Sequence, residues 1–222
     1  MMSVASGEPH PTRYTDESRW PATLAVVAAV VLYARLPERL TLGPGWLLPV
    51  LEATVLLPLS IAVPRRRAGE ERLVRSAAII LIALVNVANL VSLGLLIDAL
   101  LHGTKAEGTE LVFAAMQIWG TNVVVFALWY WELDRGGPPH RAAGATRGPD
   151  FLFPQMNLAG HADSWRPLFV DYLYVSFTNA LAFSPTDTMP LTPRAKLLML
   201  VQSLASMLTV ALVAARAVNI LQ

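Results

Sequence analysis

Five apolar stretches restrict what this chain of 222 residues can fold into. They cover residues 20–36, 46–63, 76–101, 111–131 and 195–221. A helix needs about 20 apolar residues to cross a hydrocarbon core of roughly 30 Å. Only 15% of the residues are charged, whereas a soluble domain averages about 25%. The pattern predicts an all-α fold: a multi-pass transmembrane helical bundle in the lipid bilayer of an inner or plasma membrane.

The composition divides the chain into four parts. Residues 1–19 form a polar N-terminal tail, and residues 20–131 are expected to form a membrane bundle of four helices. Residues 132–164 are rich in Gly, Pro and Ala, which predicts a loop. Residues 165–222 contain a short apolar segment and then the last long helix.

Several kinds of chemistry lack the residues that they need. The chain has no cysteine, which excludes disulfides, thiolate metal sites and cysteine nucleophiles. Its four histidines have no metal-ligand spacing, and no phosphate-binding, dinucleotide-binding or hydrolase motif occurs. A net charge of +1 suggests no nucleic-acid partner. We therefore expect no enzyme, no cofactor and no metal site.

The stretch TNALAFSPTDTMPLTP, residues 178–193, is unusual for a turn between membrane helices, because it combines prolines, hydroxyl groups and a carboxylate. The segment before it, residues 167–183, would form about 25 Å of helix. That length is marginal for a full crossing and ample for a half-helix. A short helix, an oxygen-rich turn and a long helix together indicate a pore loop, in which oxygens replace part of an ion's hydration shell.

Two parts of this region resemble the two-transmembrane potassium-channel pore family. FVDYLYVSFT, residues 169–178, is similar to the pore helix of that family. DTMPLTP, residues 187–193, is similar to the D-x-x-P-x-T-P that follows its selectivity filter. The resemblance runs from Trp165 to the end of the chain, with residues 111–131 in place of the outer pore helix. It implies a homo-oligomer, a tetramer in that family, that conducts a monovalent cation.

The filter positions depart from that family. Residues 182–186 read AFSPT where potassium channels carry T-V-G-Y-G. Both glycines are missing and Pro185 has a fixed φ, so the backbone that stacks carbonyl groups in those channels is not expected. Potassium selectivity is therefore not implied. The region also resembles a broad group of uncharacterised bacterial inner-membrane proteins with a similar S-D-T or T-D-T stretch.

The candidate ion path lies in and just before this turn. Its residues are Thr178, Asn179, Ser184, Pro185, Thr186 and Asp187. Asn179 lies one helical turn before the oxygen-rich stretch, where it could brace Ser184 or Asp187. Asp187 could instead cap the last helix, although Thr192 followed by Pro193 fits an N-cap better.

Polar residues inside the apolar stretches are further candidates. Gln202, Ser206 and Thr209 share one face of the last helix. That face could line a pore in a tetramer, or its small polar groups could let helices pack closely. Glu52 and Asp171 are candidate intramembrane acids, because carboxylates are costly in lipid and often functional. For Glu52 the alternative is a structural ion pair.

Arginine placement predicts the orientation in the membrane. Residues 64–75 carry five arginines, which places that loop in the cytoplasm by the positive-inside rule. Residues 135–164 then lie there too. If residues 167–183 cross the membrane, the bundle has six segments; if they re-enter, they dip in from the cytoplasm. Charge placement favours the six-segment layout.

Three functions fit these observations. The first is a pore that passes a cation through an oligomer by way of residues 184–187. The second is a non-conducting accessory or structural membrane protein. The third is a secondary transporter that uses Glu52 and Asp171, although no inverted repeat is recognisable in the sequence.

Overall fold

The computed structural model describes residues 20–41, 68–102, 108–142, 147–158, 165–182 and 187–220. Its helices are α1 (Trp20–Ala34), α3 (Ala68–His102), α4 (Gly108–Leu133), α5 (Pro138–Ala142), α6 (Phe169–Ala182) and α7 (Pro193–Ile220). Three 3₁₀ turns, η1 (Glu38–Leu40), η2 (Asp134–Gly136) and η3 (Pro154–Asn157), and two short strands, β1 (Phe151–Leu152) and β2 (Met189–Pro190), complete the described elements. The predicted stretch 46–63 lies outside the described residues.

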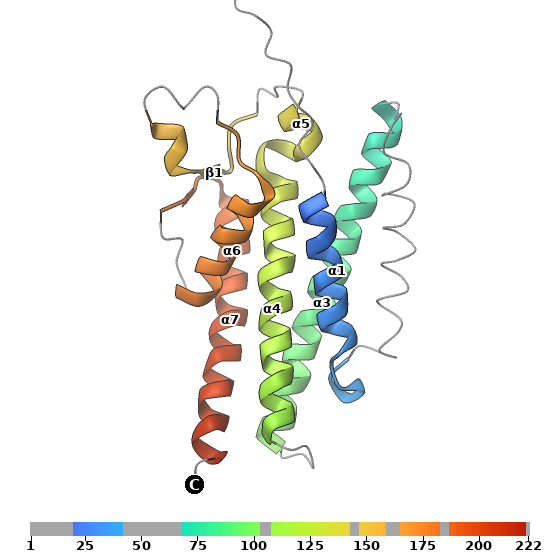
Figure 1. The fold of residues 1–222 in the computed structure, drawn as a ribbon, viewed down its shortest axis with the longest axis vertical. Coiled ribbons are helices and arrows are strands. Elements are labelled where there is room, and N and C mark those ends of the chain that lie inside the picture. Colours follow the sequence, from blue (N-terminus) through green and yellow to red (C-terminus); the bar gives the residue numbers. More distant parts are fainter. Residues whose placement is uncertain are drawn as a thin grey trace, which may run out of the picture.

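Helix α4 is the centre of the bundle, and it contacts α1, α3, α6 and α7 (Figure 1). Its sequence explains this position, because apolar or small residues occur on almost every side of it. Fourteen of its residues are buried, among them Phe126 and Tyr130. A helix that is apolar all round is buried by its neighbours, so the other helices are arranged around α4.

Helices α3, α4 and α7 are long and apolar enough to cross a membrane, over Arg75–His102, Gly108–Gly136 and Pro193–Arg216. Helix α1 is apolar but shorter, with 15 residues. Large apolar side chains point outward from these helices, for example Ile80 on α3 and Leu200 on α7. The chain is therefore a mostly helical, integral membrane protein. The all-α class is confirmed, and three of the five predicted spans coincide with these long helices.

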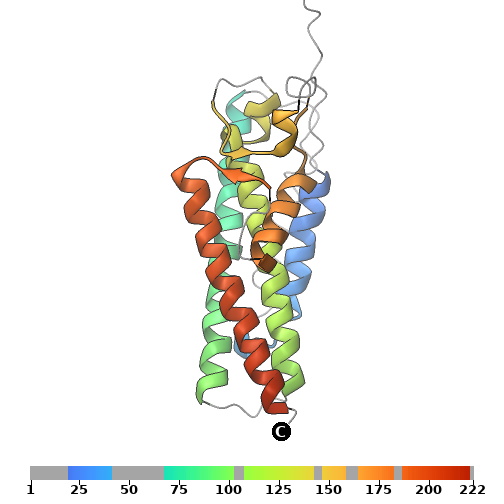
Figure 2. The same cartoon turned by 90° about the vertical axis from the view of Figure 1, so that its left-hand side faces the viewer.

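The two ends of the bundle differ in character. At one end, η1 packs against α3, and Arg39 pairs with Glu110 at the start of α4. We call this the η1 end. At the other end, the C-terminus of α4, the β1–β2 pair and the starts of α6 and α7 come together (Figures 1 and 2). We call this the cap end.

Helix α6 enters the bundle from the cap end and stops partway along α4 and α7 (Figure 2). It has 14 residues, about 21 Å of helix. By β2 the chain is back at the cap end, where Phe151 of β1 pairs with Pro190 and Leu152 pairs with Met189. Helix α6 is therefore re-entrant with respect to the bundle. The crossing that the six-segment layout assigned to residues 167–183 is not seen, because the β1–β2 pair holds the start of α7 at the end where α6 begins.

Candidate functional site

The re-entrant helix α6 is positioned first by aromatic contacts at its start. The ring of Phe169 lies edge-on to Trp131, and the ring of Tyr172 lies edge-on to Phe153. The Asp171 carboxylate accepts a hydrogen bond of 2.7 Å from the backbone N–H of Leu168. A carboxylate in the first turn that binds the backbone N–H of the residue before the helix stabilises the helix start, as in a capping box. Asp171 thus lies in the first turn of α6, near the cap end.

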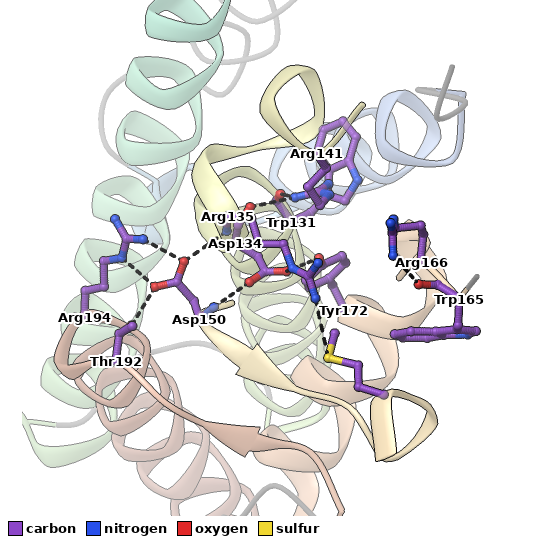
Figure 3. A network of polar contacts seen from close by, with 11 residues as sticks. Trp131, Asp134, Arg135, Arg141, Asp150, Trp165, Arg166, Tyr172, Thr192 and Arg194 are labelled. Carbon is purple, nitrogen blue, oxygen red and sulfur yellow. Dashed lines mark hydrogen bonds and ion pairs between the residues drawn. The ribbon is translucent and has the colours of Figure 1, made fainter. Parts of the chain in front are cut away.

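A polar cap, defined by Asp134, Arg141, Asp150, Tyr172, Thr192 and Arg194, joins α4, α6 and α7 at the cap end (Figure 3). Within the polar cap, Asp150 makes the contacts that hold the start of α7. The guanidinium of Arg194 donates two hydrogen bonds, of 2.7 and 2.6 Å, to the two carboxylate oxygens. The Thr192 hydroxyl and the backbone N–H of Arg135 donate to the same carboxylate. Such bidentate, charge-assisted contacts are strong and geometrically specific.

These contacts also determine the acidity of Asp150. Burial alone would raise the pKa of its carboxyl group. The hydrogen bonds from Arg194 and Thr192, the charge of Arg194 and the backbone N–H of Arg135 outweigh burial, so the pKa lies below its ordinary value. Asp150 is therefore ionised at neutral pH, in keeping with its full set of donors.

Asp134 connects the end of α4 to α6. This carboxylate is fully buried. It accepts hydrogen bonds from the backbone N–H of Asp150, at 2.7 Å, and from the hydroxyl of Tyr172, at 2.6 Å. The guanidinium of Arg141 donates to the carbonyls of Trp131 and Asp134 and lies over the ring of Tyr172 (Figure 3). The cap thus holds the start of α6 against α4.

Deeper in the bundle, Gln202 of α7 links three helices. Its Nε2 donates to the backbone carbonyl and the hydroxyl of Ser176 on α6. Its Oε1 accepts hydrogen bonds from the hydroxyl of Tyr130 on α4 and from the amide of Asn179 on α6. Every polar atom of this buried side chain has a partner. In a low-dielectric interior such a network favours one arrangement of the helices.

The polar face of α7 continues inside the chain's own bundle. Asn122 of α4 donates to the hydroxyl of Ser206, at 2.8 Å, and to the carbonyl of Gln202. The hydroxyl of Thr209 donates to the carbonyl of Ala205 in its own helix. Gln202, Ser206 and Thr209 are all buried among these helices. This placement favours the packing interpretation of that face, because in lipid polar groups are satisfied between neighbouring helices.

The other predicted site residues divide into three groups. Thr178 donates to carbonyls of its own helix, at Tyr174 and Val175. Asn179 donates to Gln202 and to the carbonyl of Met199, so it braces α6 against α7. Ser184, Pro185, Thr186 and Glu52 lie outside the described residues.

Asp187 is exposed and lies two residues before β2, at the cap end. The capping role belongs to Thr192, as the sequence predicted. Its hydroxyl accepts from the backbone N–H of Ala195, and Pro193 follows it as the first residue of α7. The N-cap of α7 is therefore Thr192, which lies five residues after Asp187.

Sequence reasoning missed Asp134 and Asp150, the two buried carboxylates of the polar cap. Both are next to turn-forming residues, in DRGG and GPDF, and acidic residues beside Gly and Pro usually indicate a solvated turn. The one available signal was that each adjoins an aromatic, apolar segment. Their side-chain donors Tyr172, Thr192 and Arg194 lie 38 to 44 positions away, a distance at which local patterns carry no information.

Within the described parts of the chain, no group of three His, Asp or Glu side chains could hold a metal ion. Comparisons with protein-family models, with curated proteins and with solved structures give no match for this chain.

Proposed function

We propose that this integral membrane protein passes a monovalent cation, as a homo-oligomer, along a path beside the C-terminal end of α6. One observation supports this function best: α6 is a half-helix that ends inside the bundle. Its partner Gln202 lies nine residues into α7, about 14 Å along that helix. The C-terminal end of α6, a few residues beyond Asn179, therefore lies well below the cap end.

A half-helix that ends at this depth has a physical consequence. The last four carbonyl groups of a helix have no partner within the helix, and they carry the negative end of its dipole. Irregular backbone at membrane depth is tolerated only where protein buries it or where it lines a watery path. Half-helix C-termini coordinate cations in transporters for this reason. The hydroxyl groups of Ser184 and Thr186 follow directly in the chain.

The buried hydrogen bonds of Gln202 and its neighbours restrict the position of such an ion path. The Gln202, Ser206 and Thr209 face is occupied by contacts with α4 and α6, so we do not place the path along it. The outer face of α6, with Val170, Tyr174, Phe177 and Leu181, is apolar and exposed. In the proposed homo-oligomer this face contacts the neighbouring subunit.

The orientation differs from that of a potassium channel. Arg75, Arg135, Arg141 and Arg194 all belong to the cap end, and the positive-inside rule places that end in the cytoplasm. Helix α6 would then enter from the cytoplasm, whereas the potassium-channel pore helix enters from outside. The resemblance therefore supports the plan of helix, turn and helix, and not the family's orientation or selectivity.

The test is cation flux into liposomes that contain the purified protein. Because the chain has no cysteine, Ser184→Cys can be labelled selectively with a water-soluble thiol reagent. We expect the label to block flux in Ser184→Cys and not in Leu200→Cys, whose side chain points outward from α7. Asp187→Asn should alter the flux. Absence of potassium and sodium flux at several pH values and voltages would refute the proposal.

A non-conducting accessory protein is the second candidate. The observation in its favour is that Gln202, Tyr130, Ser176 and Asn179 satisfy one another within one chain. Such a bundle needs no second copy to satisfy these groups. A monomer in detergent, together with crosslinks to another membrane protein, would support this candidate. For the transporter alternative, Asp171 is already engaged by the backbone N–H of Leu168, and Glu52 lies outside the described residues.

A further inference from the structure

A groove lies between α3, α4 and α7 toward the η1 end, far from the polar cap. Its walls are apolar and include Leu100 of α3, Val112 of α4 and Val213 of α7. One charged side chain, Arg216 of α7, also lines it. Among the described residues, the groove thus combines a hydrocarbon surface with the cation of Arg216.

Arg216 has a donor that none of the described residues satisfies. Its Nε is buried and has no hydrogen-bond acceptor among the described residues. The two carboxylates paired at this end have other partners, since Glu110 binds Arg39 and Asp98 binds His102. A guanidinium stays charged at any physiological pH and needs an anionic or carbonyl oxygen when it leaves water.

The depth of Arg216 indicates which acceptor is within reach. Arg216 lies 23 residues after Pro193, about 35 Å along α7. If the cap end lies at one membrane surface, Arg216 lies at the level of the opposite headgroups, because the hydrocarbon core is roughly 30 Å thick. Lipid phosphates are the abundant anions at this level, and arginine binds phosphate through two donors.

We propose that this groove binds one anionic phospholipid from the leaflet at the η1 end, with its phosphate on Arg216 and an acyl chain along the apolar walls. A soluble anion would leave those walls uncovered and would meet only one cation. A neutral lipid would make the same apolar contacts with the walls, but its headgroup would be attracted less strongly to Arg216. The site is independent of the proposed ion path, which lies at the C-terminal end of α6.

The experiment measures the binding of phosphatidylglycerol and phosphatidylcholine to the purified protein in a neutral detergent, by native mass spectrometry and by the shift in unfolding temperature. We expect a preference for phosphatidylglycerol. Arg216→Gln should reduce that preference by roughly five- to tenfold, and Arg216→Lys should retain part of it. The matched control is Arg35→Gln, which removes an exposed arginine just before η1 that does not line the groove.

A second variant tests the walls without a change in charge. Val213→Trp should fill the groove and weaken the binding of both lipids, which keeps the test informative if Arg216→Gln folds poorly. The inference is overturned if Arg216→Gln keeps the wild-type preference, or if Arg35→Gln loses as much of it. It is also overturned if inorganic phosphate alone stabilises the protein as much as phosphatidylglycerol does, because the ligand would then be a soluble anion.

Discussion

Replacement of Asp150 by Asn should weaken the attachment of α7 to the cap end and so destabilise the protein. The change keeps the size of the side chain and removes the charge that holds Arg194 through two hydrogen bonds. Removal of one partner of a fully buried pair costs about 3–5 kcal/mol. Asp150 is buried, but the Arg194 side chain is 37% exposed, so water can solvate the released guanidinium. Hydrogen bonds to charged groups contribute about 1.5–3 kcal/mol, and we expect a loss of about 2–3 kcal/mol.

The assay is thermal unfolding of the purified protein in detergent. For a chain of this size, a loss of 1 kcal/mol lowers the unfolding temperature by roughly 2–4 °C, so Asp150→Asn should lower it by roughly 5–10 °C. Asp98→Asn is the control, because it alters an exposed contact with His102, and exposed polar pairs contribute little even when both groups are charged. The double variant with Arg194→Gln should cost less than the sum of the single changes, because both remove the same interaction.

The pH dependence supplies a second readout. The pKa of Asp150 is lower in the folded protein than in the unfolded chain. Its stabilising contribution is therefore complete above the unfolded pKa of about 4 and is lost as the pH falls through the folded pKa. The stability gap between the wild type and Asp150→Asn should be constant from about pH 5 upward and shrink below about pH 4. The reasoning would be refuted if Asp150→Asn and Asp98→Asn lowered the unfolding temperature equally. It would also be refuted if the stability difference between the wild type and Asp150→Asn did not change with pH.

Three other changes test the remaining supports of α6 and α7. Gln202→Leu should cost about 3 kcal/mol in thermal unfolding, because it removes the acceptor of the buried Tyr130 hydroxyl and one of the two acceptors of the Asn179 amide; a loss below about 1 kcal/mol would contradict the network. Thr192→Ala should cost about 1–2 kcal/mol, measured in the same way, because it removes the N-cap of α7. Gly137→Ala should cost about 1–3 kcal/mol, because Gly137 has a φ of +91° and an added Cβ would lie 2.9 Å from a backbone oxygen. Gly148→Ala, which meets no such contact and has no positive φ, should be nearly neutral, and similar losses for the two glycine variants would contradict this interpretation.

Local patterns were sufficient for part of the fold. Long apolar runs with few charges can be stable only as membrane helices, which is why α3, α4 and α7 were predictable from hydropathy alone. The start of α7 was equally predictable, because Thr192 followed by Pro193 satisfies the first turn through groups adjacent in the chain. The segment of α6 was recognised as short, and its length allowed both a crossing and a re-entry.

The sequence by itself determined that this chain is a helical membrane protein and where its long helices lie, because those properties depend on composition and on neighbouring residues. Only the tertiary structure decided that α6 re-enters, since this follows from the pairing of Leu152 with Met189 and from the contacts of Asp150 with Arg194. It also decided that Gln202 faces the inside of its own bundle. A helical face shows which residues lie together, but the neighbour that buries them is chosen by packing between segments far apart in the chain.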